Sequence, residues 1–126
     1  MLEMHGVSRL VASFNDVIPG FVFSGVFFPE KTLSEKPEQV RAFLRGLVRS
    51  FEFMRAEEAQ AREFIPKYVK VEREVAFASA LRDFSGNGRV PDSQLEKQLG
   101  LMRDFKLIDE MVPVGNVVDY SFLPAR

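Results

Sequence analysis

From Pro37 onward, apolar residues recur every three or four positions, which commits most of the chain to amphipathic helices. The pattern is strongest in residues 38–54, where apolar side chains follow i, i+3, i+4, i+7 spacing. They are Val40, Phe43, Leu44, Leu47, Phe51 and Met54. Pro37 suits a first helical position, because the N–H that proline lacks would have no helical partner there. The spacing predicts a long helix that buries this apolar face.

Its opposite face carries Arg41, Arg45, Arg49 and Arg55. Such a face can bind an anionic partner, but neighbouring glutamates offset its charge and favour a solvated surface.

Three further helices are predicted downstream from shorter stripes of the same kind. Their ranges are 57–69, 72–84 and a stretch that begins after Pro91 and buries Leu95, Leu99, Met102 and Phe105. Pro66 should kink the second helix or end its regular part near Ile65. Ser93 and Glu96 have the spacing of a capping box for the last helix. Beyond Ile108 the chain is expected to be irregular.

Residues 21–28 are the main β territory of the sequence. The run is aromatic, β-branched and almost continuously apolar, which is typical of a strand buried on both faces. Gly25 inside it suggests a bulge or a close backbone approach. Residues 7–14 can supply one neighbouring strand, and Asn15 and Asp16 then mark a turn. We therefore expect a helix-rich α/β fold, with one or two strands covered by about four helices.

Composition limits the function classes open to the chain. Its 126 residues have room for one domain, spanning 1–126. A formal net charge of −1 removes the electrostatic argument for a nucleic-acid or anionic-membrane surface. The sequence has no cysteine, which excludes disulfides, thiolate metal ligands and thiol catalysis. No apolar run approaches the roughly 20 residues of a membrane span, so direct membrane insertion is not expected.

No set of residues predicts catalysis. His5 is the one histidine, and a frayed or exposed side chain near the start of the chain is favoured over a catalytic base. The carboxylates are scattered over predicted helix surfaces. The glycines of residues 85–88 fit a turn better than a phosphate-binding loop, because no phosphate-binding motif follows a strand there. We predict no catalytic residue, no metal site and no cofactor.

Two segments carry a resemblance to a known family. One is the helix start Pro37-Glu38-x-Val40-x-x-Phe43-Leu44, and the other is the tail Val118-Asp119-Tyr120-Ser121-Phe122-Leu123. With the order of elements between them, the chain resembles the C-terminal half of the nitrate/sulfonate/taurine-type solute-binding proteins of ABC transporters. That superfamily also holds binding proteins and synthases for the thiamine pyrimidine precursor. The resemblance covers about residues 8–124.

The resemblance implies part of a type II periplasmic-binding-protein lobe. Its expected parts are a crossover segment at 7–20, a central strand at 21–28, helices at 37–109 and a C-terminal tail at 110–126. In that family the ligand lies in a cleft between two lobes. Most ligand contacts, and the catalytic residues of the synthase branch, would belong to an N-terminal half that this sequence lacks. The chain is thus expected to bind a small molecule only together with that half.

Asn15, Asp16 and Ser24 occupy the places nearest to the implied cleft and are the candidate ligand-binding residues. Asn15 and Asp16 are also ordinary turn formers, an alternative that the sequence favours. Asp119 fits a helix or turn cap better than a ligand group.

The resemblance implies a solute-binding component of an ABC-type importer for a small organic or inorganic anion or a pyrimidine-like nutrient. An ABC permease would be its partner, and its location would be periplasmic or otherwise extracytoplasmic. The sequence shows no signal peptide, so a cytoplasmic location stays open. One alternative is a part of a thiamine-precursor biosynthesis protein, and another is a non-enzymatic helical interaction domain. The unpaired edges of residues 21–28 further predict a homodimer.

Overall fold

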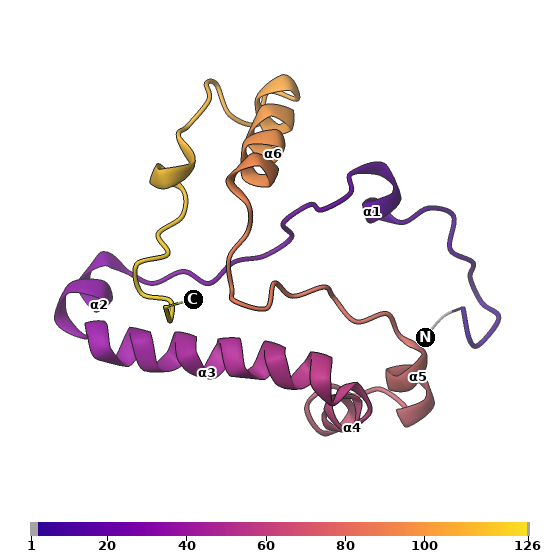
Figure 1. The fold of residues 1–126 in the computed structure, drawn as a ribbon. Coiled ribbons are helices and arrows are strands. Elements are labelled where there is room, and N and C mark those ends of the chain that lie inside the picture. The colour runs from indigo at the N-terminus through magenta and orange to yellow at the C-terminus, as the bar shows by residue number, and fades with distance from the viewer. Residues whose placement is uncertain (1–2, 126) are drawn as a thin grey trace.

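The chain folds into helices joined by irregular segments (Figure 1). The computed structural model describes residues 3–125. Their elements, in chain order, are α1 (Phe14–Val17), α2 (Glu30–Glu35), α3 (Pro37–Ala56), α4 (Glu58–Tyr68), α5 (Arg73–Ala78), α6 (Asp92–Asp104) and a 3₁₀ helix, η1 (Val114–Asn116). Within that range there is no strand. The expected α/β lobe is therefore wrong, because the helices have no sheet to cover.

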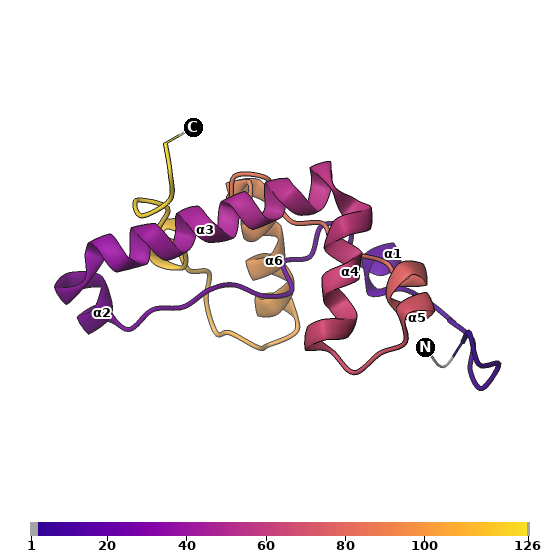
Figure 2. The same ribbon diagram turned by 90° about the horizontal axis from the view of Figure 1, so that it is seen from below.

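The helix α3 forms the long axis of the molecule, and the other elements are placed along it (Figures 1 and 2). α2 precedes it at one end, while α4 crosses its other end and leads to α5. α6 stands away from α3, and the chain after it returns through η1 so that the tail lies beside α3. The segment between α1 and α2 is drawn out and passes α6. The arrangement is thus open rather than layered.

The long helix predicted from residue 37 is confirmed, and the predicted apolar face is buried or half-buried at every position except Phe43. Pro37 is its first residue. Val40 and Val48 are only 2% and 7% exposed, whereas Phe43 is 54% exposed. Phe43 contacts Phe28 edge-on, with ring centroids 5.7 Å apart. The helix packs against the tail and the segment after α5 instead of against a strand. Val40 and Val48 lie on the side that makes these contacts.

Both segments predicted as β, 7–14 and 21–28, are irregular apart from the start of α1. A strand is stable only when a neighbouring backbone takes up its N–H and C=O groups. Val22 finds a side chain instead, since the Gln98 amide accepts from its N–H and donates to its C=O. The helices of this chain have no strand edge with which the other residues of 21–28 could pair.

The predicted helices on either side of residue 70 are both present, with different lengths. α4 continues through Pro66 to Tyr68, so it does not end near Ile65, although proline removes the bond that a residue at this position would donate to Arg62 C=O. α5 is shorter than predicted. The Arg62 guanidinium, on α4, donates to Ala76 O at 2.7 Å and to Ser79 O at 2.8 Å. These carbonyls would otherwise accept from the next helical turn, so Arg62 favours the end of α5 there.

The last predicted helix is confirmed as α6, with two differences at its ends. Its N-cap is Pro91, and no side chain caps it, so the Ser93/Glu96 capping box is not formed. Leu95 is buried as predicted. Phe105 is the C-cap and is 73% exposed, contrary to the expectation that it is buried. The apolar stripe therefore ends within the helix.

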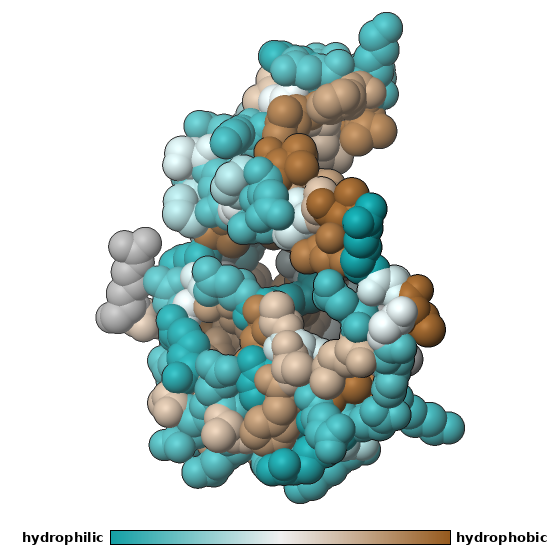
Figure 3. Space-filling view, turned by 90° about the vertical axis from the view of Figure 1, so that its right-hand side faces the viewer, coloured by the Kyte–Doolittle hydropathy of each residue, from teal (hydrophilic) through white to brown (hydrophobic). Residues whose placement is uncertain are grey.

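The buried core is small for a chain of this size. The buried apolar residues are Val40, Val48, Val75, Ala76 and Leu95. The chain exposes 10039 Å², whereas a compact protein of 14.4 kDa exposes about 6,800 Å². Figure 3 shows apolar side chains at the surface and a hollow between the upper and lower parts of that face. Much apolar surface that a compact fold would bury is thus still in contact with solvent.

Candidate functional site

The structure places Asn15 and Asp16 in α1, where both shape the local backbone. The Asp16 carboxylate accepts a hydrogen bond from Ser13 N–H at 3.0 Å. Ser13 Oγ in turn accepts from Asn15 N–H at 3.2 Å, which completes a capping box. The Asn15 Oδ1 atom accepts from Gly20 N–H at 3.3 Å. These bonds are those of turn formers, and a ligand role for either residue remains a prediction.

Ser24 lies apart from this turn, in the exposed segment that leads to α2. No hydrogen bond among the described residues joins Ser24 to Asn15 or Asp16. The three candidate positions therefore do not form one cluster in this structure. Their role in ligand binding rests on the resemblance alone.

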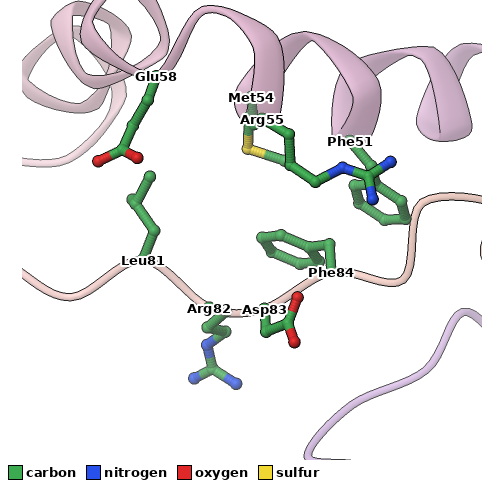
Figure 4. A pocket seen from close by; sticks show the side chains of 8 residues that line it. All are labelled: Phe51, Met54, Arg55, Glu58, Leu81, Arg82, Asp83 and Phe84. Atoms are coloured by element: carbon green, nitrogen blue, oxygen red, sulfur yellow. The ribbon is translucent and has the colours of Figure 1, made fainter.

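A cavity lies between the end of α3 and the segment after α5 (Figure 4). It is lined by Phe51, Met54, Arg55, Glu58, Leu81, Arg82, Asp83 and Phe84. Its volume is about 200 Å³, below the roughly 300 Å³ at which sites for drug-sized ligands begin. The Phe51 and Phe84 rings are stacked with centroids 4.7 Å apart and form its apolar side. The space is large enough for a molecule of a few heavy atoms but not for a drug-sized ligand.

The charged groups around this cavity are mostly engaged elsewhere. Glu58 is paired with Arg62, whose Nη2 lies 2.8 Å from its carboxylate. The Arg55 guanidinium lies against Gly86, and a side chain at Gly86 would collide with it. In Figure 4, Arg82 and Asp83 point away from the cavity. Nothing here combines an activated nucleophile with a base, and no chemical step is assigned to the cavity.

A second constellation joins the start of α3 to the C-terminal tail. Arg41 Nη1 donates to Ser121 O at 2.8 Å, and its guanidinium carbon lies 4.9 Å from the Phe122 ring centroid. Further along the tail, the Tyr120 hydroxyl donates to Val90 C=O and accepts from Val90 N–H, both at 3.2 Å. The tail is thus fixed to α3 on one side and to the segment before α6 on the other.

Asp119 stabilises the same tail through a tight turn. Its Oδ1 accepts from Ser121 N–H at 2.8 Å. This backbone hydrogen bond, with a further bond to the Ser121 side chain and the positive charge of Arg41, lowers the pKa of Asp119 below its ordinary value of 3.8. The cap role expected for Asp119 matches this geometry.

A third arrangement lies where α6 meets the drawn-out segment before α2. Gln94 and Gln98 stand one turn apart on α6 and hold the backbone of residues 20–22. The Gln98 amide lies 2.8 Å from Val22 N and 3.1 Å from Val22 O, and Gln94 donates to Gly20 O. Two glutamines at i, i+4 thus act as side-chain substitutes for a neighbouring strand.

Sequence reasoning did not identify Arg41, Gln94 or Gln98 as positioning residues. Arg41 was placed on a solvated face, yet its side chain is 39% exposed and binds the tail. The i, i+4 spacing of the two glutamines was a usable signal, because that spacing puts both amides on one side of a helix.

Within residues 3–125, no group of three or more His, Asp or Glu side chains is placed to hold a metal ion. The helices of this same range are all too short or too polar to cross a membrane. No protein-family model, curated protein or solved structure matches the chain.

Proposed function

We propose that the chain is a solute-binding component of an ABC-type importer, acting together with a second polypeptide segment that carries most of the ligand contacts. The solute is a small organic or inorganic anion or a pyrimidine-like nutrient. An ABC permease as partner and an extracytoplasmic location belong to the same proposal. No catalytic step is assigned to this chain.

The observation that carries this proposal is the contact between the two segments of the resemblance. Eighty residues separate Arg41 from Ser121 along the chain. The Arg41 guanidinium, in the first turns of α3, nevertheless binds the backbone and one ring of the tail. Two motifs of one family that lie together in space support a common structural role for them.

The exposed apolar surface is consistent with a second segment. The chain presents about 3,000 Å² more surface than a compact protein of its mass. The cavity beside the end of α3 offers such a solute few polar partners, because Glu58 is paired with Arg62 and Arg82 and Asp83 point away from it (Figure 4). A site for an anion therefore needs contacts from another polypeptide.

Uptake by cells tests the import role. A strain of the source organism without this gene should take up labelled taurine, nitrate, an alkanesulfonate or a pyrimidine more slowly, for at least one of the four. The wild-type gene should restore uptake. Arg41→Ala, which releases the tail, should restore it poorly, and Arg45→Ala, on the exposed side of the same helix, should restore it fully.

Unchanged uptake of all four solutes would contradict the import role. A strain that keeps normal uptake but grows only with added thiamine would place the chain in the biosynthetic branch of the superfamily instead.

A second candidate, a non-enzymatic helical interaction domain, is favoured by one specific observation. Helices are the regular structure of residues 3–125, without a strand, and large apolar side chains such as Phe14, Phe27 and Leu107 are more than half exposed. Such a surface is typical of a protein-binding module. Normal uptake and normal thiamine synthesis in the deletion strain, with a stable protein partner of the chain, would favour this role.

A further inference from the structure

The segment that leads into α2 has a backbone without partners. Val22 is its last residue with both backbone groups bonded, through the Gln98 amide. Among residues 3–125, no hydrogen bond is made by the N–H or C=O groups of residues 23–28. Exposed, drawn-out backbone of this kind is a template for pairing with another chain.

The side chains of this segment are as exposed as its backbone. Phe23 is 71%, Val26 50% and Phe27 89% exposed. Phe23 has one partner, the Arg82 guanidinium, which lies 4.1 Å from its ring centroid. Phe27 is the most exposed large apolar residue of the chain. The two rings flank Gly25 symmetrically, each two residues away.

The two edges of the segment differ, because only one of them faces α6. In an extended chain, the N–H and C=O of one residue point to the same side, and successive residues alternate. The groups of Val22 point toward α6, because Gln98 binds them. An extended continuation would direct Ser24 and Val26 to that same side. The groups of Phe23, Gly25 and Phe27 would then form the free edge.

We propose that a second copy of this chain pairs with this edge, antiparallel and about a two-fold axis at Gly25. In that register Gly25 lies opposite Gly25 of the second copy, and Phe23 lies opposite Phe27. Each exposed ring gains a cross-strand aromatic neighbour, an arrangement that stabilises antiparallel pairs.

A second copy fits this edge better than an unrelated strand for two reasons. The Phe-x-Gly-x-Phe order is symmetric about Gly25, so one surface complements itself, as a two-fold interface requires. The chain as a whole also exposes about 3,000 Å² more than a compact protein of its mass, and an interface that takes roughly 800 Å² from each partner would cover only part of it. A net charge of −1 adds little repulsion between copies. The pairing belongs to the isolated chain and does not depend on a role in import.

Disulfide trapping tests the register, because the chain has no cysteine of its own. In Gly25→Cys the two Cα atoms would lie about 5.5 Å apart, within disulfide range. In Phe27→Cys the two new thiols would be four ladder positions apart, about 14 Å, beyond that range. Under mild oxidation Gly25→Cys should form covalent dimers at least tenfold faster than Phe27→Cys. Equal rates, or no dimer from Gly25→Cys, would overturn the register.

Sedimentation at micromolar concentration tests the pairing itself. The wild-type chain should have close to twice the mass of one 14.4 kDa chain. Phe27→Lys should weaken the dimer at least tenfold, whereas Phe105→Lys, at a similarly exposed ring outside the segment, should leave it unchanged. A wild-type monomer would overturn the proposal. Equal weakening by both variants would also do so, because it would indicate unspecific apolar association.

Discussion

At the scale of single residues, the same side-chain type occurs both buried and exposed in this chain. Val40 on α3 is 2% exposed, and Val11 before α1 is 87% exposed. Deleting buried methyl groups loses their transfer free energy and leaves a cavity, whereas an exposed valine loses neither. Comparing the same substitution at the two valines therefore shows how much stability comes from burial of the side chain, because the residue type is the same.

Val40→Ala should lower the free energy of unfolding by about 1–3 kcal/mol. Val11→Ala, the matched control, should change it by no more than about 0.5 kcal/mol. Urea unfolding followed by circular dichroism measures both. Equal effects of the two changes would show that α3 does not bury Val40 in solution.

Asp119 makes the attachment of the tail dependent on pH. Its pKa is lowered in the folded chain, so its ionised form contributes stability above its ordinary pKa of 3.8. That contribution is lost as the pH falls through the lower folded value. Asp119→Asn can still accept the Ser121 bond but cannot titrate. The variant should be less stable than wild type at about pH 6, and the difference should close below 3.8.

The difference in stability between wild type and Asp119→Asn does not include the effect of the other carboxylates, because these titrate in both proteins. Glu63 is one of them, because its hydrogen bond to Arg73 lowers its pKa as well. Urea midpoints of the pair, measured over the acid range, give the difference directly. A difference that does not change with pH would contradict the role assigned to the Asp119 charge.

At the scale of helices, Arg62 determines how α4 and α5 are joined. Its side chain is 12% exposed, and it bonds Glu58 within α4 and two carbonyls at the end of α5. A half-buried carbonyl that loses a charged donor is costly, because water does not fully replace the bond.

Arg62→Met keeps most of the apolar stem and removes the donors. We expect a loss of about 2–4 kcal/mol in the free energy of unfolding, since Ala76 O and Ser79 O would lose their partner. Arg45→Met, on an exposed face of α3, should cost less than about 0.5 kcal/mol. Similar unfolding curves for the two variants would contradict the assigned role of Arg62.

Helix positions were predictable from sequence because the helix is a local structure. Pro37 and the apolar spacing after it located α3, and the stripe with Leu95 located α6. The end of α5 was not predictable. It depends on Arg62, a residue of another helix, and spacing within one segment does not report such a contact.

The segment 21–28 failed as a predicted strand for a related reason. Its apolar composition is typical of a buried strand, but a strand also needs a neighbouring backbone edge, which composition does not supply. Of the candidate site, Asn15 and Asp16 were located as turn formers. The contact of Arg41 with the tail was not, because no local pattern links positions eighty residues apart.

At the scale of the whole molecule, the helices are well formed, but few side chains are buried between them. Five side chains are buried among residues 3–125, and the chain exposes about 3,000 Å² more than a compact fold of its mass. The cavity beside the end of α3 measures about 200 Å³, and the charged side chains around it are paired elsewhere or point away from it (Figure 4). A solute-binding function therefore requires polar contacts from another polypeptide.

Calorimetric titration of the isolated chain tests this requirement most directly. With taurine, nitrate, an alkanesulfonate or a pyrimidine as titrant, we expect dissociation constants no tighter than about 1 mM, a binding free energy near −4 kcal/mol. Micromolar affinity for any of the four would contradict the account, because a chain with this surface and this cavity would then form a complete site on its own.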